Sequence, residues 1–221
     1  ATLGAMAHAT DSPIERAGAH LSALWLRLLG VPTSALLIAL GAHIAIPVDP
    51  YGVPITLQTL AVVLTALCLG PRFGSLGILV YVLAGAIGAP VFSGGQAGPQ
   101  VILGITGGYI LGFLLCQPLV TAFIRRRDGS IRGWGALILG TLLGHLAIFA
   151  VGLPWLYLVL NSDPDTAATW LGSGAKLWGP IPADGVLYGG FIRYLPGMLL
   201  KCAIAVIIGR WACPWAMRRI W

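Results

Sequence analysis

Residues 134–160 read WGALILGTLLGHLAIFAVGLPWLYLVL, a run without Asp, Glu, Lys or Arg. A helix needs about 20 apolar residues to cross the roughly 30 Å hydrocarbon core of a bilayer, and this run is longer than that. The whole chain has the same character, since 57% of its 221 residues are hydrophobic and only 9% are charged. Its mean hydropathy is +0.89. The sequence therefore predicts an integral membrane protein.

Five more apolar stretches are separated by proline, glycine or charged residues, which are typical helix boundaries. Together with the first run they give an all-α membrane fold of six transmembrane helices. The predicted spans are residues 33–48, 53–69, 72–89, 101–124, 134–160 and 191–211.

The segments outside these spans suggest further divisions. Residues 14–30 (IERAGAHLSALWLRLLG) alternate apolar and polar positions at helical spacing, which is typical of an amphipathic helix on a membrane surface. We expect a tail with this helix over residues 1–32, the six-helix membrane domain over 33–212 and a cytoplasmic tail over 213–221. Residues 161–190, rich in Gly, Pro and Trp, are expected to form a long external loop.

The basic residues fall mainly on one side of this arrangement. Lys and Arg are enriched in cytoplasmic loops, so both termini are predicted to be cytoplasmic. That side then receives Arg16, Arg27, Arg72, Arg125, Arg126, Arg127, Arg132, Arg210, Arg218 and Arg219. The outer side receives only Lys176 and Arg193. We therefore attribute the net charge of +6 to membrane topology and expect no nucleic-acid partner.

One lysine stands inside an apolar run, LPGMLLKCAIAVIIG, at residues 195–209. At about 1.5 Å per residue, Lys201 lies roughly 8 Å below the outer start of the sixth span. It either extends outward to the membrane surface or faces a cavity that holds a ligand. Gln58, Tyr109 and Trp155 are placed in the same outer layer. Small-ligand sites combine apolar walls with a few polar groups, which favours the cavity.

Patterns for catalysis or metal binding are missing from the sequence. It has no HExxH, GxSxG or Walker A motif, and its four cysteines show no zinc-type spacing. We interpret His43 and His145 as packed, hydrogen-bonded side chains. No cofactor, metal or enzymatic activity is predicted. A small intramembrane enzyme using His43, His145 or Lys201 is the less favoured alternative, and a purely structural membrane partner is another.

Several motifs between residues 46 and 113 resemble the BioY family, the substrate-binding (S) components of energy-coupling factor (ECF) transporters that handle biotin. Four elements occur in the order and spacing of that family, and a looser likeness extends over about residues 36–209. The four are VPITLQT (53–59), LGPRFG (69–74), GAIGAPVF (85–92) and TGGYILGF (106–113).

This resemblance implies a biotin uptake protein of the prokaryotic cell membrane with six helices and a pocket open to the outside. Its implied partners are a membrane coupling protein and two cytoplasmic ATPases. Ala35 and Ala39 fit the AxxxA pattern by which such S components pack on the coupling protein, although ordinary helix packing also explains that pair.

The shared outer layer and the resemblance together give a predicted set of substrate-binding residues. These are Lys201, Met198, Gln58, Phe92, Gly94, Gln96, Tyr109 and Trp155. The family reads PGDLLK where this chain reads PGMLLK, so Lys201 matches and Met198 replaces an aspartate. Three explanations stay open: Gln96 or Asp184 substitutes for the acid, the ligand is another biotin-like vitamin, or the chain is a divergent paralogue. We favour biotin with altered contacts.

Overall fold

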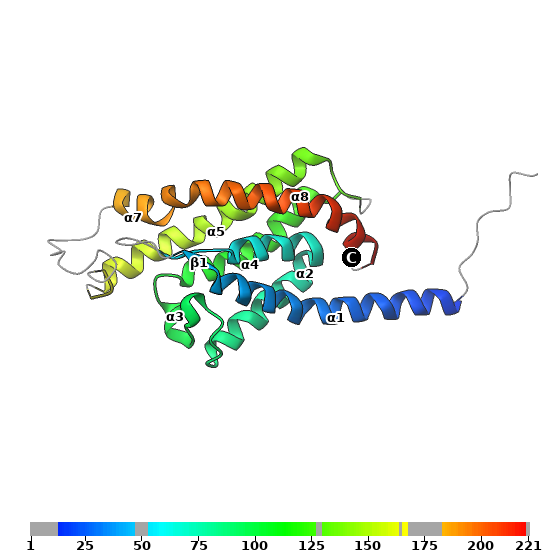
Figure 1. Ribbon diagram of the computed structural model, residues 1–221, viewed down its shortest axis with the longest axis horizontal. Coiled ribbons are helices and arrows are strands. Elements are labelled where there is room, and N and C mark those ends of the chain that lie inside the picture. Colours follow the sequence, from blue (N-terminus) through cyan, green and yellow to red (C-terminus); the bar gives the residue numbers. More distant parts are fainter. Residues whose placement is uncertain (1–12, 47–52, 127–129, 164, 168–182, 220–221) are drawn as a thin grey trace, which may run out of the picture.

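The computed structural model describes residues 13–46, 53–126, 130–163, 165–167 and 183–219 (Figure 1). Helices dominate it, and the only strands in these ranges form a two-stranded ribbon. The elements in chain order are α1 (Pro13–His43), β1 (Ala45–Ile46), β2 (Ile55–Thr56), α2 (Gln58–Ala86), η1 (Ser93–Gly95), α3 (Pro99–Leu103), α4 (Gly107–Ile124), α5 (Trp134–Ser162), α7 (Ala183–Gly190), η2 (Ile192–Tyr194) and α8 (Leu195–Arg219).

Five helical segments in the described ranges are long and apolar enough to cross a membrane. They are Leu24–His43, Gln58–Ala86, Gly107–Ile124, Trp134–Ser162 and Gly185–Ala216. Large apolar side chains stay exposed on their outer faces, for example Leu158 at 61% and Ile207 at 58%, as lipid contact requires. A mostly helical protein with several membrane spans is thereby confirmed, whereas the count of six stays a prediction.

The second and third predicted spans are two limbs of one element, α2, which is kinked at Gly70. This residue has φ 70° and ψ −175°, a conformation that side-chain-bearing residues avoid, and Pro71 follows it directly. Figure 1 shows the second limb turning back from the first. The kink therefore falls where the Gly-Pro pair predicted a helix boundary. The two limbs are nevertheless joined without a loop and form one helical element.

The start of the chain differs from the prediction. No break separates an amphipathic helix from a first span, because α1 runs continuously through the expected boundary at residues 32 and 33, with Pro32 inside it. The helix ends at His43 instead of residue 48, and Ala45–Ile46 then pairs with Ile55–Thr56. Pro47 restricts the residue before it to extended conformations, which explains the early end.

The fourth predicted span is divided in the structure. Gly104 is extended (φ −82°, ψ −166°), so the short helix α3 ends before α4 begins at Gly107. The last helix, α8, continues to Arg219, so residues 213–219 prolong it rather than forming a separate tail. Of the expected external loop 161–190, residue 164 and residues 168–182 lie outside the described ranges, and residues 183–190 form α7.

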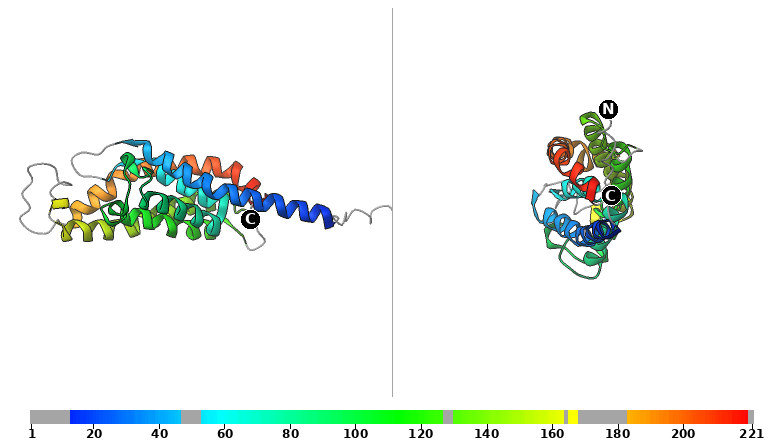
Figure 2. Two further views of the ribbon diagram at one scale, coloured as in Figure 1. Left: turned by 90° about the horizontal axis from the view of Figure 1, so that it is seen from below. Right: turned by 90° about the vertical axis from the view of Figure 1, so that its right-hand side faces the viewer.

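The helices lie roughly along one long axis, and α4 packs closely along α5 (Figures 1 and 2). The start of α1 and the end of α8 lie at the same end of the bundle. The ribbon, α3 and α7 lie toward the opposite end. Which end faces the cytoplasm stays a prediction.

Candidate functional site

A cavity of about 980 Å³ opens among the ribbon, the loop after α2, and the helices α3, α4, α5 and α8. Most of the surface of its walls is apolar, although nearly half of the lining residues carry a polar side-chain group. The described lining comprises His43, Ala45, Val53, Pro54, Ile55, Thr56, Gln58, Thr59, Tyr81, Phe92, Ser93, Gly94, Gly95, Gln96, Gln100, Val101, Gly104, Ile105, Thr106, Tyr109, Ile110, Phe113, His145, Ile148, Phe149, Thr166, Gly190, Tyr194, Met198 and Lys201. This is the character of a small-molecule site.

Lys201 faces this cavity. Its Nζ donates a hydrogen bond to Thr59 Oγ1 at 3.2 Å, across from α8 to the first turn of α2. No carboxylate occurs among the lining residues that the structure describes. The ammonium group therefore retains two N–H donors for another acceptor. Thr59 was not singled out by sequence reasoning, although it ends the VPITLQT motif.

Gln58 and Phe92 meet at Tyr81 on the second limb of α2. Gln58 Nε2 donates to the Tyr81 hydroxyl at 2.6 Å, and the Tyr81 ring stands edge-on to Phe92 at 5.5 Å. All three are buried, Phe92 at 1% exposure. The Gln58 amide therefore supports the wall through Tyr81, and Phe92 contributes an apolar surface that packs on the Tyr81 ring.

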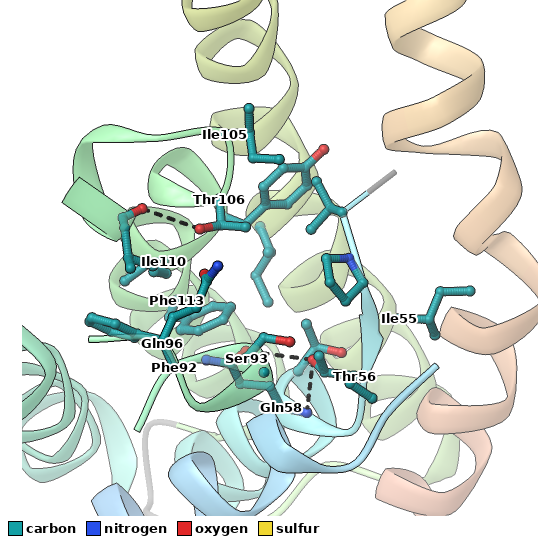
Figure 3. Close-up of a pocket in the computed structure, with 18 of the residues that line it drawn as sticks. Ile55, Thr56, Gln58, Phe92, Ser93, Gln96, Ile105, Thr106, Ile110 and Phe113 are labelled. Carbon is teal, nitrogen blue, oxygen red and sulfur yellow. Dashed lines mark hydrogen bonds between the residues drawn. The ribbon is translucent and has the colours of Figure 1, made fainter. Parts of the chain in front are cut away.

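The loop after α2 bends over the cavity at Gly94 and Gly95, whose φ angles are 70° and 73°. Ser93 lies next to Gln58 and Thr56 in Figure 3, and Gln96 lies between Phe92 and Thr106. The Ser93 hydroxyl oxygen is buried and has no hydrogen-bond partner within the described part of the chain. Gln96 is exposed at the rim. Of the two, Ser93 was missed by sequence reasoning.

Aromatic rings close the side of the cavity formed by α4, α5 and residues 191–194 before α8. The Phe149 ring stands edge-on to Tyr109 at 6.0 Å and to Phe191 at 5.0 Å. The Tyr109 hydroxyl donates to the Gly190 carbonyl at 3.0 Å, and the Tyr194 hydroxyl donates to the Val53 carbonyl. These two bonds join segments far apart in sequence, so they hold the wall together.

Met198 lies on the cavity wall as predicted and is 5% exposed. Trp155 is absent from the described lining. Its Nε1 instead donates to the Gly104 carbonyl at 2.9 Å, at the corner between α3 and α4. Trp155 therefore supports the corner between α3 and α4 and does not itself line the cavity. The Asp184 side chain, a proposed substitute for the missing acid, lies outside the described part of the structure.

We expect Trp155→Phe to loosen this corner, because the Gly104 carbonyl loses its partner while the ring volume is largely kept. An unpaired group of this kind costs about 1–3 kcal/mol, and the unfolding temperature should fall by several degrees, at roughly 2–4 °C per kcal/mol. Thermal unfolding and amide exchange at residues 104–107 measure the effect. Trp211→Phe is the control, since Trp211 is 80% exposed; equal behaviour of the two variants would contradict the assigned role.

Both intramembrane histidines border the cavity, and each ring binds its own helix. Nδ1 of His43 lies 2.8 Å from the Ala39 carbonyl, and Nδ1 of His145 lies 3.0 Å from the Thr141 carbonyl. The interpretation as hydrogen-bonded side chains is confirmed for both. Only His145 is packed, at 1% exposure, whereas His43 is exposed.

The two alanines expected to bind a partner are both 8% exposed. They belong to the face of α1 that packs on the rest of the bundle, while Leu36 and Leu40 are exposed. In this conformation Ala35 and Ala39 therefore present little surface to a second protein. Their burial agrees with the alternative of close packing between small residues.

Metal binding finds no support among the described residues. No group of three or more His, Cys, Asp or Glu side chains is close enough to hold an ion there. Cys68, Cys116, Cys202 and Cys213 form no disulfide bonds.

The fold and cavity together define a helical membrane protein with an internal small-molecule site. A model of the BioY family matches residues 19–218, so the chain belongs to the BioY family. The "Biotin transporter BioY" of Rhodobacter capsulatus is 31% identical over 179 residues, 80% of this chain and 87% of that protein. The "Probable biotin transporter BioY" of Pyrococcus horikoshii is 42% identical over 125 residues, 55% and 70% of the two chains.

A solved structure also resembles this fold. It is described as the "S-component for biotin from an ECF-type ABC transporter", and the similarity has a TM-score of 0.67 at 23% identity. The match covers 90% of this chain and 92% of the other. At this identity it bears on the fold alone, and it agrees with the helical arrangement in Figure 1.

Proposed function

We propose that this protein is the substrate-binding S component of a biotin uptake transporter. It captures biotin in the cavity and delivers it inward with an ECF energising module. The observation that carries this proposal is Lys201, whose Nζ faces a largely apolar cavity and has spare donors. Membership in the BioY family and the names of the relatives support the same function, which is transport rather than catalysis.

The cavity suits the chemistry of biotin. Biotin has a bicyclic body with a largely apolar surface and a ureido group with two N–H donors and one carbonyl acceptor. Phe92, Phe149 and Met198 provide apolar surface for the body. Lys201 provides a donor for the carbonyl, and a hydrogen bond to a charged group is worth about 1.5–3 kcal/mol.

The membrane arrangement proposed with this function has six crossings, with the two limbs of α2 counted separately. Both termini are cytoplasmic, the cavity opens outward, and the protein resides in the cell membrane of a prokaryote. The position of both described chain ends at one end of the bundle supports an even number of crossings. The proposed partners are a membrane coupling protein and two ATPases, with Ala35 and Ala39 reaching the coupling protein only if α1 shifts against α2.

Biotin binding by the purified protein tests the proposal. Calorimetry should give a saturable heat, and the unfolding temperature should rise, because a ligand at 100 times its Kd stabilises the folded state by about 2.7 kcal/mol. A panel of other vitamins is the control. The absence of both heat and thermal shift with biotin would exclude it as the ligand.

Met198 favours a second candidate for the ligand, which is a different biotin-like vitamin. The reason is that Met198 places an apolar side chain where an acid was expected. If another member of the panel binds and biotin does not, this candidate replaces the first.

A further inference from the structure

His145 lines the cavity and carries a hydrogen-bonding atom, Nε2, that is buried and unused. Its Nε2 has no hydrogen-bond partner among the residues that the structure describes. The residue as a whole is only 1% exposed. A buried polar atom without a partner costs about 1–3 kcal/mol. Because His145 is a lining residue, a ligand in the cavity is one partner that would remove this cost.

The contacts of Nδ1 decide which kind of partner Nε2 requires. Nδ1 lies 3.0 Å from the Thr141 carbonyl oxygen, which has no hydrogen, so Nδ1 must be the donor. In the neutral ring the proton then resides on Nδ1, and Nε2 presents a lone pair. Nε2 is therefore an acceptor, and it requires an N–H or O–H donor from the ligand.

His145 also faces the part of α8 where the acid is missing. Its Nδ1 lies 3.4 Å from Cys202 Sγ, and Cys202 is one helical turn from Met198 on the same buried side of α8. Lys201 directly precedes Cys202 on α8 and also lines the cavity. An acceptor on α5 and a donor on α8 thus meet at one level of the cavity.

We propose that Nε2 of His145 accepts a hydrogen bond from a ureido N–H of the ligand and supplies the acceptor that Met198 cannot. Lys201 then donates to the ureido carbonyl from the neighbouring helix. The ligand class is a cyclic urea or another ring with adjacent N–H and C=O groups. This assignment rests on the proposed function and makes His145 a specificity-determining residue.

The test compares the wild type with His145→Leu and His145→Gln, using biotin as the probe. His145→Leu should weaken binding about tenfold, which corresponds to one hydrogen bond of about 1.4 kcal/mol. Gln places an acceptor oxygen at a similar reach and should recover most of the loss. In the His145→Leu background, Met198→Asp should also recover affinity, because it restores an acceptor on the facing helix.

Two biotin analogues, each methylated at one ureido nitrogen, show whether His145 touches that group. For the isomer whose blocked N–H faces His145, the Leu substitution should cause no further loss, whereas for the other isomer the tenfold loss should persist. Equal losses for biotin and both isomers would indicate a purely structural role and overturn the inference.

A measurement on the unmodified chain avoids any dependence on variant folding. The ¹⁵N signal of His145 Nε2 should move on saturation with biotin, and an unchanged signal would overturn the inference. Unaltered biotin affinity in a folded His145→Leu protein would overturn it while leaving the proposed function intact. Absence of biotin binding by the wild type would overturn both.

Discussion

Replacing Lys201 with methionine is expected to weaken biotin binding by about tenfold to a hundredfold. The ammonium group is the only Lys or Arg donor among the described lining residues, and the hydrogen bond it makes to a ligand carbonyl is charge-assisted. Such bonds contribute about 1.5–3 kcal/mol, and each 1.4 kcal/mol is a factor of ten in Kd. Titration calorimetry on the purified protein measures the change.

The free protein should tolerate this substitution. Methionine is similar in length, and removing a partly buried cation relieves its desolvation, so the unfolding temperature without ligand should be unchanged or higher. Arg210→Met is the matched control, because Arg210 lies on the same helix, stacks over Trp134 at 5.4 Å and is not a described lining residue. An affinity that survives Lys201→Met would mean that the lysine does not contact the ligand.

Gly112→Ala is expected to give a large loss of stability. A Cβ at Gly112 would lie 2.7 Å from Ile148 Cα and 2.8 Å from the Ile148 carbonyl oxygen. Both are backbone atoms of α5, so no side chain can turn aside, and the two helices must separate. Overpacking of this kind costs about 1–3 kcal/mol. The unfolding temperature in detergent should fall by several degrees.

Ligand binding should weaken in the same variant, because α4 carries Tyr109 and α5 carries Phe149 into the cavity wall. Gly135→Ala is the control. Gly135 is exposed near the start of α5, and an added Cβ there meets nothing within 4 Å. Its stability should be equal or slightly higher, because alanine favours helix. Similar losses for both variants would show that the α4–α5 contact is not the cause.

Much of the cavity lining was predictable from sequence because many of its residues lie in recognisable motifs. Gln58, Phe92, Gly94, Gln96, Tyr109, Met198 and Lys201 all border the cavity. Trp155 was expected in the same layer, but its indole donates to the Gly104 carbonyl and the residue is not among the described lining. His145 was interpreted only as a packed side chain. Its Nε2 is an unpaired acceptor because the imidazole ring is turned so that Nδ1 contacts the Thr141 carbonyl. The spacing of residues in the sequence does not reveal the orientation of this ring.

The sequence by itself determined that this chain is helical and membrane-embedded. Its long uncharged runs are suited to the bilayer interior, and backbone groups there must form their hydrogen bonds within a helix because no water is available. It also located the break at Gly70–Pro71 and singled out Lys201, which lines the cavity. The tertiary structure decided which face of each helix turns inward, and so the burial of Ala35 and Ala39 and the approach of His145 to α8. The physical reason is that lipid and protein core are both apolar, so a membrane helix lacks the polar stripe that marks the outer face of a soluble one.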